Sequence, residues 1–116
     1  MEKRITYQKL GKKCGDKLSL AQGYYNVLSA FNNLSLTERE VQLVAFAAVN
    51  GNMTDKDIKE EFYKKYKTTA PTVNNIVSRL KKKGVIVKRG GKIVVEPAIS
   101  INFDNDVLLE MRISHD

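Results

Sequence analysis

The chain has 116 residues, 42% of them hydrophobic, and its 20 Lys and Arg residues outnumber 13 Asp and Glu residues, which makes the formal net charge +7. This length and composition favour one folded domain and argue against an intrinsically disordered chain. No apolar run reaches the length of about 18 residues that a membrane-spanning helix needs, and the basic N-terminus lacks the apolar run of a secretory signal. Because the single cysteine, Cys14, has no partner within the chain, we expect a protein of the reducing cytoplasm without membrane contact.

The positive charge is concentrated in the middle of the chain. Residues 59–92 hold 11 basic and 2 acidic residues, whereas residues 93–116 hold 1 basic and 5 acidic residues. Clustered positive charge attracts polyanions and releases their counterions on binding. The alternative explanation is a solvated lysine-rich surface, and the element that carries the charge decides between the two.

The first 34 residues predict an N-terminal arm and an extra helix. Ile5 and Tyr7 alternate with polar residues, which is typical of a short strand or of an arm that orders only on a partner. A helix is predicted over residues 16–33, beginning at Asp16 as a cap. Its apolar residues recur at helical spacing: Leu20, Tyr24, Val27, Leu28 and Phe31.

The next helix is predicted between residues 35 and 51. Its capping box is formed either by Ser35 with Glu38 or, in a second register, by Thr37 with Glu40, and Gly51 stands where a C-terminal glycine belongs. Apolar residues face every side of this helix, so we expect it to be buried all round. Because a three-helix domain would cover only one side, the helix over residues 16–33 or a second subunit is expected to cover the other.

Two further helices and a hairpin follow. Thr54 and Asp57 form the capping pair of the first of these helices, and Thr69 is the expected N-cap of the second, residues 69–83, with Pro71 in its first turn. This last helix has one apolar face, formed by Val73, Ile76, Val77 and Leu80, and Gly84 ends it.

A hairpin is predicted over residues 85–96, where two β-branched runs flank Gly90-Gly91. Pro97 ends its second strand or places that strand at an edge. After it, apolar residues alternate on both sides of an expected turn at residues 104–106. This pattern predicts a second hairpin, or a strand followed by a short helix; the alternating residues are Ile99, Ile101, Phe103, Val107, Leu109, Met111 and Ile113.

The segment TVNNIVSRLKKKGVIVKRGGK resembles the recognition helix and wing of bacterial winged-helix regulators, in particular those of the multiple-antibiotic-resistance type and the penicillinase-repressor type. A Thr-Val start, a basic helix end, a glycine, an aliphatic strand and a basic glycine turn recur there in this order. SLTEREVQLVAFAAVNG resembles the first helix of the same unit, so the resemblance covers residues 36–95. Because the second helix is long and the terminal extensions match no known arm, the effector binding and the dimer mode of these families are not extended to this chain.

The resemblance implies an α+β fold, a winged helix-turn-helix with a three-helix core and a β-hairpin wing at residues 35–97. Residues 1–34 then form an N-terminal arm and extra helix, and residues 98–116 form a strand-like C-terminal extension. In such a fold the helix 69–83 enters the major groove of duplex DNA and the wing, residues 85–96, contacts the backbone.

The helix geometry predicts which residues contact DNA. If the apolar stripe points inward, Pro71, Asn75, Ser78, Arg79 and Lys82 point outward. The expected base contacts are Thr72, Asn75, Ser78 and Arg79. The expected phosphate contacts are Thr68, Thr69, Lys81, Lys82, Lys83, Lys88, Arg89 and Lys92. The alternative is that these are ordinary polar surface residues.

No enzyme, metal site or cofactor is expected. The only histidine, His115, lies next to the C-terminus, and no pair of carboxylates or nucleophile with its base stands out. The favoured function is a sequence-specific transcriptional regulator in the bacterial cytoplasm, with double-stranded DNA as partner. The terminal extensions are expected to join copies of the chain into a homo-oligomer or to bind a partner protein.

Two alternatives remain open. One is a structural or assembly protein, such as a bacteriophage virion or packaging component, that uses the winged helix for docking. The other is an accessory protein of replication or plasmid partition.

Overall fold

The computed structural model describes the backbone of residues 3–10, 17–103 and 107–114, and the side chains of residues 17–103. It is an α+β structure in which four helices are followed by a two-stranded antiparallel hairpin. The elements in chain order are β1 (Lys3–Leu10), α1 (Lys17–Phe31), α2 (Glu38–Asn50), α3 (Lys56–Tyr66), α4 (Ala70–Lys82), β2 (Ile86–Arg89), β3 (Lys92–Val95), the 3-10 helix η2 (Pro97–Ile99) and β4 (Val107–Ser114).

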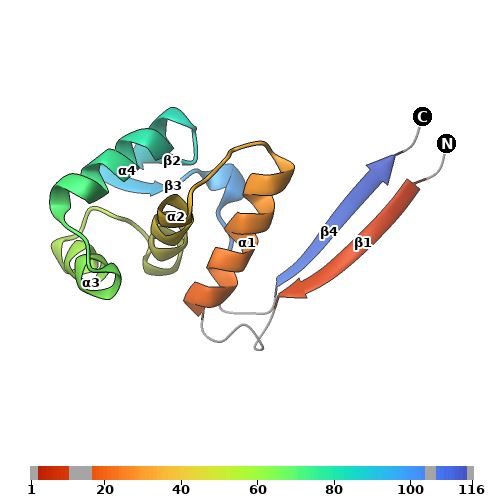
Figure 1. Ribbon diagram of the computed structural model, residues 1–116, viewed down its shortest axis with the longest axis horizontal. Helices are drawn as coiled ribbons and strands as arrows, with labels where there is room; N and C mark the ends of the chain where they lie inside the picture. Colours follow the sequence, from red (N-terminus) through yellow and green to blue (C-terminus); the bar gives the residue numbers. More distant parts are fainter. Residues whose placement is uncertain (1–2, 11–16, 104–106, 115–116) are drawn as a thin grey trace.

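Helix α2 lies at the centre of the molecule, with α1 on one side and α3, α4 and the β2–β3 hairpin on the other (Figure 1). Its consecutive residues from Leu43 to Ala47 are all buried, as the apolar sequence predicts. The expectation that the N-terminal helix covers the second side of α2 is confirmed, since α1 packs along it. Four helices therefore share one hydrophobic core.

The capping box of α2 uses the second of the two predicted registers. The Thr37 hydroxyl accepts a hydrogen bond from the Glu40 N–H (3.2 Å), and Glu40 Oε1 accepts one from the Thr37 N–H (2.8 Å). The first register, Ser35 with Glu38, is wrong, because Ser35 lies two residues before the N-cap in a left-handed conformation. At the other end Gly51, with φ of 93°, donates its N–H to the Ala47 carbonyl as predicted.

The predicted capping pair of α3, Thr54 with Asp57, is also wrong. The N-cap is Asp55, and the Thr54 hydroxyl instead accepts a hydrogen bond from the Ile93 N–H (2.7 Å). The side-chain oxygen of Asn52 accepts from the N–H groups of Thr54 and Asp55. The Thr54 hydroxyl, which the local pattern predicts to cap α3, is therefore hydrogen-bonded to β3 instead.

Helix α4 turns the predicted stripe inward. Val73, Ile76 and Leu80 are buried and Val77 is half-buried. Thr69 occupies the N-cap position, but its hydroxyl lies 3.1 Å from the Thr72 hydroxyl and makes no capping hydrogen bond.

The β2–β3 hairpin has the predicted two-residue turn. Arg89 pairs with Lys92, and Gly90 and Gly91 between them have φ of 57° and 79°. Both values lie in the left-handed region, which matches a tight hairpin turn of the type that glycine favours. Val85, Ile86 and Val95 are buried, and the Met53 N–H donates to the Ile93 carbonyl (2.9 Å), so the hairpin is joined to the α2–α3 connection.

Replacing Gly90 with alanine is expected to lower the free energy of unfolding by about 1 kcal/mol. A Cβ at this position would meet no atom within 4 Å, so the cost is the left-handed backbone alone. Thermal or urea unfolding measures it, with Gly90→Asn as the matched variant because asparagine tolerates this conformation better. An equal loss in the two variants would contradict the conformational explanation.

The C-terminal segment differs from the predicted second hairpin. Residues 97–99 form η2, and Phe103 is buried against the rings of Tyr24 and Tyr25, at centroid distances of 5.7 and 5.9 Å. The alternating apolar residues from 99 to 103 therefore pack on the helical core rather than form a strand. The expected turn at residues 104–106 and the expected cap Asp16 lie outside the described residues.

Strand β4 pairs with β1, at the opposite end of the chain, and the short-helix alternative for this segment is wrong. The antiparallel register runs from Lys3 opposite Ser114 to Leu10 opposite Val107. The resulting two-stranded ribbon extends beyond α1, away from the helices (Figure 1). Within the described ranges no helix is long and apolar enough to cross a membrane.

Candidate nucleic-acid interface

The exposed face of α4 carries a row of polar side chains. The four predicted base contacts, Thr72, Asn75, Ser78 and Arg79, are all exposed, opposite the buried stripe that holds α4 against α2. Asn74 is exposed too and lies one turn before Ser78, although it was not among the predicted contacts. Because these residues recur every three or four positions, they form one continuous polar surface.

The surroundings of α4 and the β2–β3 hairpin are basic. From residue 62 to residue 95 the sequence has ten basic residues and no acidic residue. Lys81, Lys82, Lys88 and Arg89 are exposed, and none of them is paired with a carboxylate of the described residues. These four cations are therefore available to an external anion.

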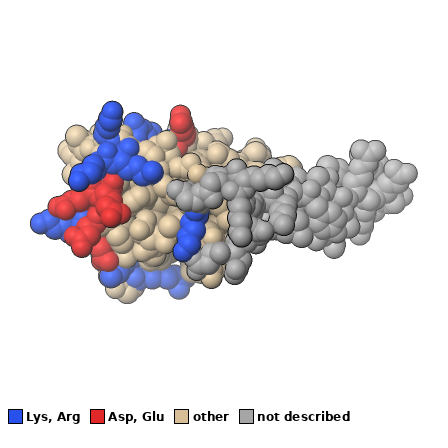
Figure 2. Space-filling model, turned by 90° about the horizontal axis from the view of Figure 1, so that it is seen from below, with Lys and Arg blue, Asp and Glu red and all other residues tan. Residues whose placement is uncertain are grey.

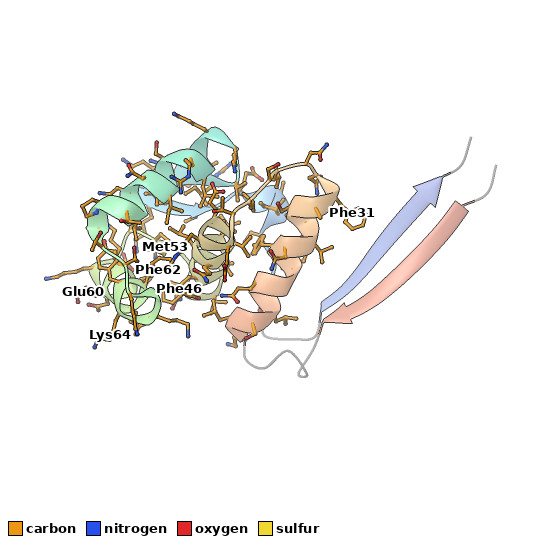
Figure 3. The ribbon with its side chains drawn as sticks, viewed as in Figure 1. Phe31, Phe46, Met53, Glu60, Phe62 and Lys64 are labelled. Carbon is orange, nitrogen blue, oxygen red and sulfur yellow. The ribbon has the colours of Figure 1, made fainter. Side chains whose placement is uncertain are left out.

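The surface seen from below carries charges of both signs (Figure 2). Seen from below, acidic and basic side chains lie intermixed at the end of the molecule (Figure 2). Glu60 and Lys64 lie on the side of α3 that is turned away from α4 (Figure 3). Lys56 also pairs with Glu60 at 4.0 Å along this helix. Glu60 is thus partly neutralised within α3, on the side away from α4.

One carboxylate, Glu40, lies behind the exposed face of α4. Its side chain is 0% exposed, and its Oε1 lies 3.0 Å from Lys83 Nζ. Its Oε2 lies 3.7 Å from Arg79 Nε, and the Arg79 side chain is 51% exposed. The Glu40 carboxylate therefore joins the start of α2 to two cations near the end of α4.

This arrangement alters what was expected of Lys83. Its ammonium group donates to Glu40 Oε1 and to the Ser35 carbonyl (3.0 Å each), so it points toward α2 rather than outward. Its role as a phosphate contact stays a prediction. Thr68 is half-buried and Thr69 is exposed, both at the start of α4.

The pKa of Glu40 lies below its ordinary value. Burial by itself would raise this pKa, but hydrogen bonds from the Thr37 N–H and the Lys83 ammonium, with the charge of Lys83, outweigh it. Glu40 therefore stays ionised in the folded protein at neutral pH.

The lowered pKa of Glu40 predicts an acid-sensitive contribution to stability. A carboxylate whose folded pKa is below its unfolded pKa stabilises the fold above the unfolded value, and this contribution is lost as pH falls through the folded value. We therefore expect the free energy of unfolding of the wild type to decline below pH 4.5, the ordinary value for Glu40, more steeply than that of Glu40→Gln. Urea unfolding from pH 7 to pH 3 measures the difference, and parallel curves for the two proteins would contradict it.

The last predicted phosphate contact, Lys92, also has a partner. Its Nζ lies 3.2 Å from Asp55 Oδ1, and both side chains are about half exposed. Hydrogen bonds from Lys92 and from Asn52 lower the pKa of Asp55. The pair joins the turn end of the hairpin to the start of α3, and it remains open to solvent and to competing anions.

Sequence reasoning did not find Glu40 as part of this site. The only signal was its position in a capping box, which needs a hydrogen-bond acceptor and not a charge. Among the described residues, no group of three or more His, Cys, Asp or Glu side chains is placed to hold a metal ion.

Comparison of the chain with protein families, with curated proteins and with solved structures found no match.

Proposed function

We propose that this chain is a non-enzymatic winged helix-turn-helix protein that binds double-stranded DNA and regulates transcription at specific sequences. The observation that carries the proposal is the exposed polar face of α4, flanked by four cations that pair with no carboxylate within residues 17–103, in a segment (62–95) without acidic residues. In this proposal α3 and α4 form the helix-turn-helix, α4 enters the major groove, and the β2–β3 hairpin is the wing.

The chemistry of the α4 face suits base recognition. The Asn75 amide matches adenine and the Arg79 guanidinium matches guanine, and each bidentate contact contributes about 1–3 kcal/mol of discrimination. Lys81 and Lys82 at the end of α4, with Lys88 and Arg89 on the hairpin, neutralise the flanking phosphates. Thr69 and Thr72 offer hydroxyl groups to a phosphate at the helix start.

A regulator of this kind usually binds as a dimer to two half-sites about one helical turn apart. We propose that the β1–β4 ribbon supplies the contact between copies. A two-stranded ribbon is marginally stable alone in water, and β1 and β4 pair only with each other among the described strands. Pairing with a second ribbon would satisfy one free edge of each.

The same ribbon favours a second candidate function. A projecting two-stranded element is suited to β-addition to a different protein, as in an assembly or virion component that uses the helical domain for docking. Here the partner of the ribbon is a large particle rather than a second copy.

In-vitro selection from a pool of randomised duplexes, with light scattering on the same sample, tests the proposal. We expect enrichment of a defined motif by a dimer, and an affinity that falls steeply with salt. Lys82→Ala is expected to reduce the affinity for every duplex about equally. Lys56 is an exposed lysine on α3 outside the proposed contacts, so Lys56→Ala is the matched control and is expected to bind as the wild type does. Ring-sized particles without enriched sequences would contradict the regulator and support the assembly role.

A further inference from the structure

Glu40 has one carboxylate oxygen that its capping role leaves unused. Oε1 accepts hydrogen bonds from the Thr37 N–H and from Lys83 Nζ, at 2.8 and 3.0 Å. Oε2 is buried and has no hydrogen-bond partner among the described residues, and it lies 3.7 Å from Arg79 Nε. Because a buried oxygen without a hydrogen bond costs stability, helix capping alone does not account for a charge at this position.

We propose that Glu40 is a positioning residue for Arg79: it holds the guanidinium by its Nε edge, so that the two terminal amino groups are directed to a guanine in the major groove. This inference rests on the proposed DNA-binding function and assigns the residue that orients one of its base contacts. The Arg79 side chain is 51% exposed, and its contact with the Glu40 carboxylate is made through Nε. With Nε held, the terminal pair remains for a bidentate contact.

The charges of the cluster support this role. Two cations share the Glu40 carboxylate: Lys83 Nζ lies 3.0 Å from Oε1, and Arg79 Nε lies 3.7 Å from Oε2. The contact at Nε leaves the terminal N–H groups of Arg79 as donors for the O6 and N7 acceptors of guanine. An arginine side chain loses rotational freedom when it binds, and a buried carboxylate that orders it beforehand reduces this loss.

A glutamine at position 40 separates capping from positioning. Capping boxes accept glutamine as well as glutamate, so Glu40→Gln retains an acceptor for the Thr37 N–H but removes the buried charge. Thr37→Ala is the matched structural control, because it removes the hydroxyl that accepts from the Glu40 N–H and leaves the carboxylate in place.

The experiment uses the full chain and the duplex that the wild type selects from the random pool. Affinities are measured for this duplex and for versions in which each G·C pair is replaced in turn. Arg79→Ala is expected to reduce discrimination about 5- to 150-fold at one G·C pair. We expect Glu40→Gln to reduce it about threefold or more at the same pair, and the double variant to lose no more than Arg79→Ala alone. Affinity for random duplex is expected not to fall in Glu40→Gln, because its net charge is one unit more positive.

Three results would overturn the inference: wild-type discrimination in Glu40→Gln, additive losses in the double variant, or an equal loss of discrimination in Thr37→Ala. Absence of duplex binding by the wild type would overturn the proposed function itself. A measurement without DNA separates the two cases. We expect the Arg79 Nε–H bond vector to be more ordered in the wild type than in Glu40→Gln by nitrogen-15 NMR relaxation, and equal order in the two proteins would exclude positioning whether or not DNA binds.

Discussion

Phe62→Ala is expected to lower the free energy of unfolding by about 3–5 kcal/mol, the largest effect on stability that we expect of one substitution. The Phe62 ring is fully buried, with centroids 5.3 Å from Phe46 and 4.7 Å from Tyr66. It lies between α2 and α3, against Phe46 (Figure 3). The variant removes this ring contact and leaves a cavity beneath the helix pair that supports α4.

The matched control makes the same chemical change at an exposed position. Phe31, at the end of α1, is 64% exposed, so we expect Phe31→Ala to change the free energy of unfolding by less than about 0.5 kcal/mol. Urea unfolding of both variants measures the pair. A large loss in Phe31→Ala would show that the outer face of α1 is covered in solution, by a second copy or by another part of the chain.

Asn75→Ala is expected to weaken binding to the selected duplex by about 1–3 kcal/mol, roughly 5- to 150-fold. The asparagine amide can donate to one adenine atom and accept from another, and alanine does neither. Because Asn75 is exposed and its side chain makes no hydrogen bond to another described residue, the melting temperature is expected to stay unchanged. Affinity for duplexes of random sequence is also expected to stay unchanged, since no charge is lost. Titration with labelled duplexes of both kinds measures this difference.

Asn26→Ala is the matched control for this prediction. Asn26 is an exposed asparagine on α1, on the other side of α2 from the α4 surface. We expect the control to bind both duplexes as the wild type does. Equal affinities of Asn75→Ala and the wild type for the selected duplex would remove Asn75 from the interface, and an equal loss in Asn26→Ala would place the interface elsewhere.

The two wrong capping pairs share one cause, a contact with a residue that is distant in the sequence. The sequence offered two registers for the start of α2, and both satisfy the same local pattern. The structure uses Thr37 with Glu40, in which Glu40 also reaches a cation on α4, and this contact spans 43 residues along the chain. At α3, Thr54 fits the local pattern, but β3 takes its hydroxyl across 39 residues. In both cases a distant group decides between local options.

The sequence by itself determined the features that depend on neighbouring residues. The buried stripe of α4 follows from a period of 3.6 residues, and the hairpin turn follows from the two glycines, which adopt positive φ at low cost. The exposed polar face of α4 follows from the same period. Each of these features is specified within about a dozen residues, so no knowledge of the remaining chain was needed.

The tertiary structure alone decided which distant segments meet. Alternation marked both chain ends as strand-like, but it does not say which strand pairs with which, and β4 pairs with β1 rather than with its own neighbour. The contact of Glu40 with Arg79 likewise depends on how α2 and α4 pack. A charge pattern along the chain carries no information on such a contact, because an ion pair depends on distance in space and not on separation in sequence.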